Sequence, residues 1–402
     1  MTQSLIVTLN AGSSSLRCAV FDRTEDGPTP RLRLSLRGLP KRMIWERHDA
    51  RSGETEEREI DAPDEPADAQ DSARSEMLRR LLDEIQEGQI AAVVHRVVHG
   101  GQTHQAPVEV DDTVLSDLDA LSPLAPSHQP HNLAAIRDLA ERFPGLLQVA
   151  CFDTAFHRTL PRNDRIFALP KDLTENGVVR YGFHGLSFDH VAATLAETRP
   201  VIAKGRVIVA HLGHGVSMCA MHDGRSVATT MGMTALDGLP MGQRSGALDP
   251  GILLYLIEQR GMSPADLRQM LYERSGLLGL SGISGEMIDL LASKHDDAAR
   301  AVDFFVYRCQ REIGSLVAAL GGLDALVFTG GIGEHAPEIR ERICAGLGWL
   351  GVALDADTNR SGATQLSALD ARIATLMIPT DEEAVLARNA EGLLQSSSAD
   401  TG

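Results

Sequence analysis

A short turn rich in glycine and serine follows an apolar run twice in this chain, about two hundred residues apart. The first copy joins the run Leu5–Leu9 to Asn10-Ala11-Gly12-Ser13-Ser14-Ser15, and the second joins Val207–Leu212 to Gly213-His214-Gly215. A single turn of this kind is also compatible with a plain hairpin. Glycine and serine let backbone N–H groups approach an anion closely, so two matched turns favour a phosphate site in each half. The repeat therefore predicts a duplicated fold that holds a phosphorylated ligand between its two halves.

The repeat extends beyond the turns, because the same shift aligns Cys18 with Cys219 and Asp22 with Asp223. A chain of 402 residues is long for one hydrophobic core and fits two domains. Strands that alternate with helices indicate the α/β class. We expect the closing helix to return to the first half of the fold. The expected domains are therefore residues 1–153 with 384–402, and residues 154–383.

Charge and cysteine content exclude several classes of protein. The net charge of −17 argues against a nucleic-acid partner, because binding a phosphate backbone needs clustered lysine and arginine. No lysine follows a glycine, so the chain has no Walker A motif. The apolar runs are too short to span a bilayer, and no basic segment of a secretory signal opens the chain. We expect a cytoplasmic protein without a membrane partner, whose five scattered cysteines are free thiols.

Apolar periodicity and turn residues place most of the expected elements. The stretch Arg47–Ser75 is crowded with charge and contains two prolines, so we expect an exposed loop there. The second half should contain a strand at Arg165–Ala168 and a long helix at about Asp296–Leu320. Further strands are expected at Leu5–Leu9, Arg17–Phe21, Leu32–Leu36, Met43–Glu46, Ile90–Val98, Leu146–Phe152, Arg206–Leu212, Gly215–His222, Asp324–Thr329 and Arg372–Ile378. Further helices are expected at Ser75–Gln86, Asp111–Leu121, His131–Phe143, Pro250–Arg260, Pro264–Tyr272 and Asp381–Leu394.

Several polar residues have both a chemical and a structural interpretation. Arg96 lies in the apolar strand Ile90–Val98, and a buried arginine needs a partner, for which an anionic substrate is a natural candidate. Arg244 lies in a loop of small residues, where simple exposure to solvent is the alternative. Asp153 follows a buried strand and His184 lies between glycines. A helix cap and a core histidine are the structural alternatives for these two residues.

A glycine cluster and an acidic cluster complete the candidate motifs. Gly330-Gly331-Ile332-Gly333 follows a strand and precedes a helix, a context that suits a nucleotide held against a helix N-terminus. Thr380-Asp381-Glu382-Glu383 opens the last helix, where acidic residues are common for structural reasons. His95 and His99 are four residues apart, but no glutamate lies between them and the stretch is a predicted strand. A zinc site of the HExxH type is therefore excluded.

Ten short motifs, taken together, resemble those of the acetate and propionate kinase family, in the family's order along nearly the whole chain. They are LNAGSSSLR, VVHRVVHGG, LAPSHQP, CFDTAFHR, YGFHGLSF, HLGHG, GLPMGQRSGALDP, SGLLGLSG, FTGGIGEH and IPTDEE. The resemblance implies two duplicated ribonuclease-H-like domains of the actin-like ATPase type, with a cleft between them, and a homodimer. It also implies reversible phosphoryl transfer from ATP to the carboxylate of acetate, giving acetyl phosphate and ADP, with Mg²⁺ (or Mn²⁺) as cofactor.

The resemblance also implies roles for individual residues. Asn10 and Glu382 would place the metal ion. Arg96 and Arg244 would hold the carboxylate and the phosphoryl group in transfer. The other catalytic residues would be His184, as a donor to that phosphoryl group, Asp153, as an organiser of metal and water, and His128, in support. The nucleotide-binding residues would be Ser13, Ser15, Arg17, His211, Leu212, Gly213, His214, Gly215, Glu286, Ile288, Gly330, Gly331, Ile332, Gly333, Glu334 and His335. The pocket for the small carboxylic acid would consist of Arg96, Val98, Ser127, Phe183 and Ala235.

The chain departs from the family pattern within these sites. Ile288 stands where the family has the arginine that packs on the adenine, which raises the question of the phosphoryl donor. Ser127 and Ala235 replace larger residues of the acyl pocket, so we expect propionate or another short acid to be used at least as well as acetate. The remaining departures are Arg17 for lysine, His214, Gln129 and Asp381 for asparagine, and Glu286 for aspartate.

Four other functions remain open at this point. They are a propionate or butyrate kinase, a kinase with another donor such as pyrophosphate, a nucleotide-dependent switch ATPase, and a non-catalytic relative. A switch has no use for a carboxylate-binding arginine, so the set of charged residues argues against it. If the kinase assignment holds, Arg96→Ala and Arg244→Ala should each fold normally and lose most activity, because each removes a charge that stabilises the transition state.

Overall fold

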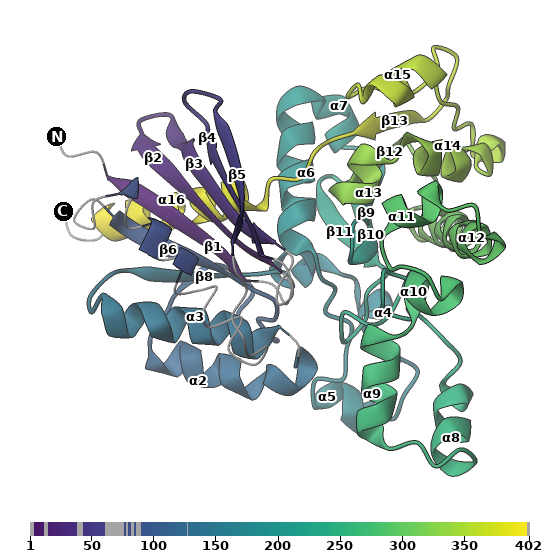
Figure 1. Ribbon diagram of the computed structural model, residues 1–402, viewed down its shortest axis with the longest axis horizontal. Coiled ribbons are helices and arrows are strands. Elements are labelled where there is room, and N and C mark those ends of the chain that lie inside the picture. The colour runs from purple at the N-terminus through teal and green to yellow at the C-terminus, as the bar shows by residue number, and fades with distance from the viewer. Residues whose placement is uncertain are drawn as a thin grey trace. The chain divides into compact units, whose positions relative to one another are not determined.

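The chain forms two compact units, and the first takes in both ends of the chain (Figure 1). In the computed structural model the first unit comprises Met1–Ala155 and Asp381–Gly402, and the second comprises Phe156–Thr380. The structure describes residues 4–11, 15–37, 43–60, 76, 77, 79–81, 84, 85, 90–126 and 128–399. The predicted site residues Ser13 and Ser127 lie outside the described residues.

The first unit is built on a sheet of eight strands in the order β5-β4-β3-β2-β1-β6-β8-β7. The strands β1 to β5 are antiparallel neighbours, whereas β1, β6 and β8 run parallel. Their bounds are β1 Leu5–Ala11, β2 Ser15–Thr24, β3 Gly27–Arg37, β4 Met43–Asp49, β5 Thr55–Ile60, β6 Ile90–Val97, β7 Val108–Glu109 and β8 Gln148–Phe152. The helices of this unit include α2 Asp112–Ala120, α3 Gln129–Arg142 and α16 Glu382–Ala399.

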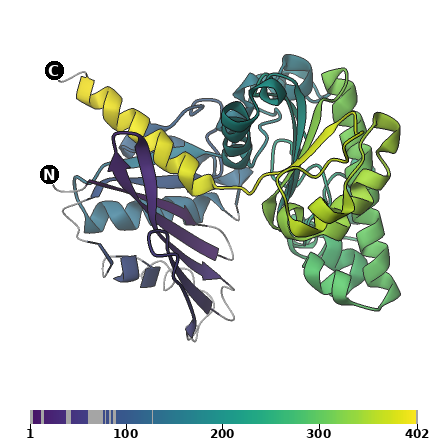
Figure 2. The same cartoon turned by 90° about the horizontal axis from the view of Figure 1, so that it is seen from above.

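Helices α3 and α16 cover opposite faces of this sheet, because alternate residues of β1 contact them. Leu9 belongs to the same apolar cluster as Leu139 of α3. Asn10, the next residue along β1, hydrogen-bonds to Glu382 of α16. Figure 2 shows α16, in yellow, lying along the first sheet. The final helix therefore completes the core of the unit in which the chain began.

The second unit repeats the central part of this sheet. Its strand order, β11-β10-β9-β12-β13, has the same pattern of antiparallel and parallel pairs as β3-β2-β1-β6-β8. The strands are β9 Arg206–Leu212, β10 Val216–His222, β11 Arg225–Thr229, β12 Ala325–Thr329 and β13 Ala374–Met377. The helices are α4 Arg162–Arg165, α5 Lys171–Glu175, α6 Gly185–Thr198, α7 Pro200–Ala203, α8 Pro250–Glu258, α9 Pro264–Glu273, α10 Gly276–Ser281, α11 Met287–Ala292, α12 Asp296–Leu320, α13 Gly330–His335, α14 Pro337–Ala345 and α15 Ala356–Ser361. The predicted α/β class and the duplication are confirmed.

The strand register corrects one detail of the predicted repeat. In the first hairpin Leu9 pairs with Cys18, and in the second Ala210 pairs with Met218. The connection between the strands is one residue shorter in the second hairpin, because Ala11 pairs with Leu16 whereas Leu212 pairs with Val216. Beyond the turn, Cys18 therefore corresponds to Met218 and not to Cys219.

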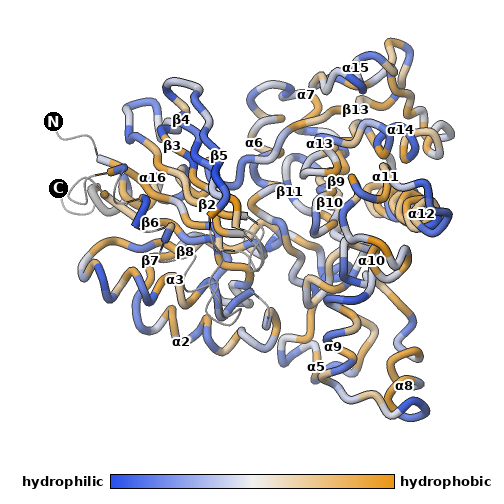
Figure 3. Tube along the Cα trace, in the orientation of Figure 1, coloured by the Kyte–Doolittle hydropathy of each residue, from blue (hydrophilic) through white to orange (hydrophobic). Residues whose placement is uncertain are grey.

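Two expected elements of the chain are wrong. The predicted loop Arg47–Ser75 contains the strand β5, which is exposed along most of its length and pairs with β4 at the edge of the sheet. Figure 3 shows that β5 is mostly hydrophilic. The predicted strand Arg165–Ala168 is absent, since Arg165 ends the short helix α4 and Ile166 makes a single bridge to Val179. The rest of the predicted loop, residues 61–75, lies outside the described residues. Across the described part of the chain, no helix combines the length and hydropathy needed to cross a membrane.

Candidate active site

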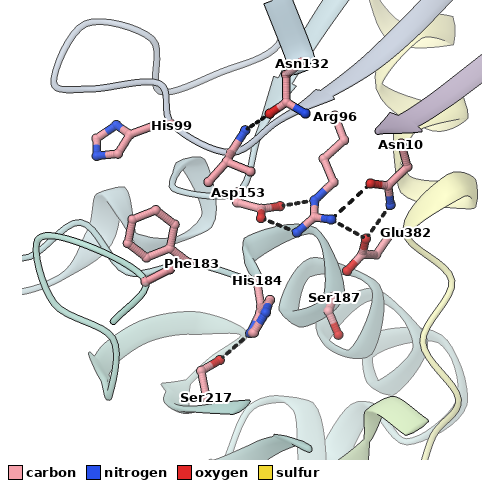
Figure 4. A network of polar contacts seen from close by, with 12 residues as sticks. Asn10, Arg96, His99, Asn132, Asp153, Phe183, His184, Ser187, Ser217 and Glu382 are labelled. Atoms are coloured by element: carbon pink, nitrogen blue, oxygen red, sulfur yellow. Dashed lines mark hydrogen bonds and ion pairs between the residues drawn. The ribbon is translucent and has the colours of Figure 1, made fainter. Parts of the chain in front are cut away.

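Arg96 is the centre of a buried polar cluster in the first unit (Figure 4). Its Nε donates to Asp153 Oδ1 at 3.0 Å and its Nη2 to Asp153 Oδ2 at 2.6 Å, which makes a two-pronged ion pair. Its Nη1 donates to Asn10 Oδ1 at 3.0 Å. Asn10 Nδ2 in turn donates to Glu382 Oε2 at 3.0 Å. The sheet thus brings together four residues that are distant in sequence, from β1, β6, the end of β8 and the start of α16.

Burial governs the electrostatics of this cluster. Asp153 is 1% exposed, and burial raises the pKa of its carboxyl group while the charge of Arg96 opposes the rise. Burial also lowers the pKa of the Arg96 guanidinium, but Asp153 and Glu382 together raise it by more, so Arg96 stays charged. The next residue, Glu383, has a raised pKa because it is buried and lies beside Glu382. Because Asp153 and Glu382 share one guanidinium, two carboxylates face a single positive charge. The charge balance of the cluster therefore favours a further cation.

Arg96 also keeps donors for an anion. A guanidinium has five N–H groups, and three of those of Arg96 are used in the bonds to Asp153 and Asn10. Its Nη1 also lies 3.7 Å from Glu382 Oε2, and its side chain as a whole is 19% exposed. The structural alternative for Asp153, a helix cap, does not account for a two-pronged bond from this buried carboxylate to an arginine.

A network of side-chain amides supports the strand ends around Arg96. Asn132 of α3 accepts from the backbone N–H of Val98 at 3.1 Å and donates to the carbonyl of Ala11 at 2.7 Å. Gln129 accepts from the N–H of His99 and donates to its carbonyl. The sequence analysis missed Asn132, because nothing in the pattern of a helix shows which of its amides contacts a strand. Gln129, noted only as a departure from the family, acts here as a structural residue.

In the second unit, His184 begins α6 in a left-handed backbone conformation. Its φ is 58°, which is uncommon outside glycine. The preceding Gly182 has φ of 74°, and a Cβ there would lie 2.5 Å from the ring of His157. His157 Nε2 donates to the carbonyl of Phe183 at 3.0 Å, and burial lowers the pKa of His157 to about 4. A neutral, buried histidine therefore holds the backbone from which His184 projects.

The side chain of His184 meets Arg244 at the second repeated turn. His184 Nδ1 is hydrogen-bonded to Ser217 Oγ at 2.8 Å, as Figure 4 shows. A Cβ on Gly215 would lie 2.8 Å from Arg244 Nη2 and 3.0 Å from His184 Nε2, so only a residue without a side chain lets both groups reach this turn. Arg244 Nη1 donates to the carbonyl of Ala235 at 2.6 Å. Neither residue is a plain surface or core residue.

His211, at the end of β9, completes this second cluster. Its ring stacks on that of His184 with centroids 4.2 Å apart. Its Nδ1 is hydrogen-bonded to Ser187 Oγ at 2.8 Å. Ser187 and Ser217 were not predicted, since each acquires its role only when α6 and β10 lie against the strand end.

The glycine motif Gly330–Gly333 forms the first turn of α13 and does not precede the helix as a separate loop. Gly330 has φ of 78°, and a Cβ there would lie 2.9 Å from the carbonyl oxygen of Leu212, so glycine is required where β12 turns into the helix. Glu334 Oε1 accepts from the N–H groups of Gly330 at 2.9 Å and of Thr380 at 3.0 Å. Glu334 therefore has a structural task in addition to any contact with a ligand.

The positions that depart from the family lie at the edge of this cluster. His214 Nδ1 is 3.0 Å from Glu286 Oε1, and this bond lowers the pKa of Glu286. Ile288, near the start of α11, is 77% exposed, so it has no task in the core. Arg17 is exposed on β2, and His128 precedes α3. Among the acyl-pocket residues, Val98 belongs to the first unit, and Phe183 and Ala235 belong to the second.

Comparisons with known proteins agree along nearly the whole chain. The sequence profile of the Acetokinase family matches residues 5–388. An acetate kinase of Rhodopseudomonas palustris (strain TIE-1) is 48% identical over 388 residues, which cover 96% of this chain and 97% of the relative. A propionate kinase from Francisella tularensis has a similar structure, with a TM-score of 0.86, 35% identity, and coverage of 96% of this chain and 98% of the other. The acetate kinase of Porphyromonas gingivalis has a TM-score of 0.83 and 32% identity, covering 97% of this chain and all of the other. The fold, the two polar clusters and these matches together show that the chain belongs to the acetokinase family.

Proposed function

We propose that this protein transfers the γ-phosphoryl group of ATP to the carboxylate of acetate, giving acetyl phosphate and ADP, and that it catalyses the reverse reaction as well. The observation that carries this proposal is the Arg96 cluster, in which a partly buried guanidinium paired with the buried carboxylate of Asp153 keeps donors for an anion. It occurs in a chain that is 48% identical to an acetate kinase over nearly its full length. A switch ATPase has no need for such a group.

The chemistry explains why this cluster contains no obvious general base. Acetate has a pKa of about 4 to 5, close to that of Asp or Glu, and is already ionised at pH 7. One of its oxygens attacks the γ-phosphorus, and the bond from phosphorus to the bridging oxygen of ADP breaks. Both oxygens of Asp153 are engaged by Arg96, which suits a positioning group better than a proton acceptor.

The main barrier is the approach of one anion to another. We assign Arg96 to the carboxylate, and Arg244 and His184 to the phosphoryl group. Cationic and N–H donors aimed at the transferring group stabilise the charge that spreads over its oxygens. His128 would support this arrangement.

The donor set at the start of α16 suits a divalent metal ion shared with the substrate. Mg²⁺ takes carboxylate and amide oxygens, keeps several waters, and often binds through one or two carboxylates together with substrate phosphates. Within the described ranges, no cluster of three or more His, Cys, Asp or Glu side chains is placed to hold a metal by itself. Asn10 and Glu382 would hold Mg²⁺ or Mn²⁺, which when bound neutralises negative charge on the phosphates.

We assign ATP to the second unit. Its phosphates would contact the turn Gly213–Gly215 and the start of α13, where N–H groups and glycines allow close approach. A homodimer and a cytoplasmic location complete the proposal. They rest on the family resemblance and on the composition.

A second candidate substrate is propionate. The structure with a TM-score of 0.86 is described as a propionate kinase, and Ala235 removes bulk from the proposed acyl pocket. Each methylene buried in such a pocket contributes about 0.8 kcal/mol. Propionate should therefore be used at least as well as acetate, and a preference for acetate above tenfold in kcat/KM would exclude this.

The test is a hydroxamate assay for acyl phosphate with acetate, propionate and butyrate, each run with ATP and with pyrophosphate. We expect product with ATP, and the ranking of the acids identifies the substrate. Product only with pyrophosphate would show that the donor site is altered around Ile288. No product under any condition would overturn the kinase proposal.

A further inference from the structure

Thr380 is the last residue of the second unit, and two hydrogen bonds hold it to other residues of that unit. Its N–H donates to Glu334 Oε1 at 3.0 Å, and its hydroxyl donates to Ser187 Oγ at 3.0 Å. The next residue, Asp381, is fastened in the first unit, where its Oδ1 accepts from the N–H of Ala384 at 3.0 Å and its carboxylate pairs with Arg33. The peptide bond between Thr380 and Asp381 therefore joins a residue held in the second unit to a residue held in the first.

Ser187 passes the hydrogen bond from Thr380 on to His211. Ser187 is fully buried, and its hydroxyl has one proton to donate. Because Thr380 donates to Ser187 Oγ, the proton of Ser187 is available for His211 Nδ1, 2.8 Å away. An imidazole whose Nδ1 accepts a hydrogen bond carries its own proton on Nε2.

The Nε2 side of His211 faces the second repeated turn. A Cβ on Gly213 would lie 3.3 Å from His211 Nε2, so this ring nitrogen lies beside the backbone of the turn. The ring of His211 also stacks on that of His184, whose Nε2 lies beside Gly215. His211 therefore presents a donor where His184 and Arg244 also converge.

We propose that Ser187 and Thr380 are positioning residues that fix His211 as its Nε2–H tautomer, and so hold a hydrogen-bond donor at the phosphoryl-binding turn. The nature of the ligand rests on the proposed function, but the assignment of the tautomer does not. Since Thr380 is the last residue of the second unit, the same bond ties this donor to the connection between the units.

Glu334 also holds the connection between the units, because it accepts a hydrogen bond from Thr380. Its carboxylate oxygen receives the N–H groups of Gly330 and Thr380, so it links the start of α13 to the connection. Arg340, which is 1% exposed, donates to the carbonyls of Gly333 and Glu334 and holds the end of the helix. Glu334 therefore acts as a positioning residue for the start of α13 and for Thr380.

The tautomer of His211 is tested in the full-length chain by ¹⁵N NMR of labelled histidine, without substrate, with assignment by a His211→Gln variant. The wild type should show an accepting Nδ1 and a protonated Nε2. Ser187→Ala should lose the signature of an accepting Nδ1, because the donor is gone. An unchanged His211 spectrum in folded Ser187→Ala would overturn the proposal. This result does not depend on whether the protein phosphorylates acetate.

Activity supplies the second readout, with Thr380→Val and Thr380→Ser as a matched pair. Loss of one such hydrogen bond should lower kcat about threefold to tenfold in Thr380→Val, with KM for acetate unchanged. Thr380→Ser keeps the hydroxyl and should stay within twofold of the wild type. Equal losses in the two variants would overturn the role of the hydroxyl, and this pair remains informative if Ser187→Ala fails to fold.

Glu334→Gln and Glu334→Ala separate position from charge. A glutamine oxygen can accept the same two N–H groups, so Glu334→Gln should keep the Tm of the wild type, whereas Glu334→Ala should lower it. If Glu334→Gln lowers the Tm as much as Glu334→Ala does, the charge itself is required and the positioning role is wrong. An inactive wild type would overturn the proposed function alone, and the NMR result would still decide the inference.

Discussion

Arg96 and Arg244 differ in what their removal leaves behind. Arg96→Ala leaves the buried carboxylate of Asp153 without its partner in the Arg96–Asp153 ion pair. Breaking a buried ion pair in this way costs about 3–5 kcal/mol of stability. Arg244 is also partly buried, but its hydrogen bond to Ala235 goes to a main-chain carbonyl and not to a buried carboxylate. We therefore expect Arg244→Ala to lower kcat about 10²- to 10³-fold at unchanged stability. Arg96→Ala should lower both activity and the free energy of unfolding, which revises the expectation from sequence that both variants fold normally.

Urea unfolding together with kcat measures this difference. The control is Arg96→Ala combined with Asp153→Asn, which also removes the negative charge of Asp153. It should recover much of the stability and none of the activity. Wild-type stability in Arg96→Ala alone would mean that Asp153 does not depend on its partner.

His95 and His157 should make the fold sensitive to mild acid. Burial lowers the pKa of each imidazole to about 4, from an ordinary value of 6.5. Between these values the unfolded chain binds more protons than the folded one, so stability is full above pH 6.5 and is lost as the pH falls towards 4. Each histidine contributes a slope of at most about 1.4 kcal/mol per pH unit.

Urea unfolding at several values of pH between 7.5 and 4.5 tests this sensitivity. His157→Gln should show a shallower loss of stability than the wild type, since it removes one of the two groups. His335→Gln, at a side chain that is 82% exposed, is the control and should follow the wild type. Parallel curves for His157→Gln and the wild type would contradict the prediction.

At the scale of the elements, the turn after β9 depends on a missing side chain. In Gly215→Ala the new methyl group would lie 2.8 Å from Arg244 Nη2 and 3.0 Å from His184 Nε2, so both groups must move. We expect a fall in kcat of about 10²-fold or more, on the scale of losing one transition-state contact, with little change in Tm. Gly314→Ala is the matched control, because a Cβ at Gly314 in α12 meets nothing within 4 Å. It should keep activity and stabilise the helix by about 0.5–1 kcal/mol. Normal turnover in Gly215→Ala would show that His184 and Arg244 do not act at this turn.

The sequence predicted those elements whose pattern is local. The long helix α12 was predicted with its observed bounds because its apolar face repeats over many turns, and β1 and β9 because they are continuous apolar runs. The strand β5 was missed because its residues are mostly charged, and the composition of this segment does not indicate that it pairs with β4. In the same way Arg96 and Asp153 were found from their setting in strands. Ser187 and Ser217 were not, because their roles depend on contacts between distant elements.

At the scale of the whole molecule, duplication has produced two strand ends with different chemistry. The sequence shift that aligns the two turns also aligns Asn10 with His211. Each of these residues lies near the end of the strand before its turn, β1 or β9. Asn10 contacts an arginine and a carboxylate, whereas His211 contacts a serine and a second histidine. In the proposed reaction the first strand end would hold the metal and the acid, and the second would hold the phosphoryl group.

The return of α16 to the first unit makes that unit depend on the last residues of the chain. This helix buries Val385, Leu386 and Ala390, and Glu391 forms a two-pronged pair with Arg23 of β2. Deleting residues 381–402 should therefore abolish activity, because Glu382 is lost, and should expose the first unit to protease. The second unit, Phe156–Thr380, is continuous in sequence and should stay protected.

Limited proteolysis with mass spectrometry distinguishes the two units in this truncated protein. Cleavage should begin within the first 155 residues, since removing α16 uncovers the face of the sheet that carries Asn10. Removing only residues 400–402 is the control and should change neither activity nor the cleavage pattern. If both units are cleaved at the same rate after removal of α16, the second unit relies on the first for its stability, and the two units do not fold independently.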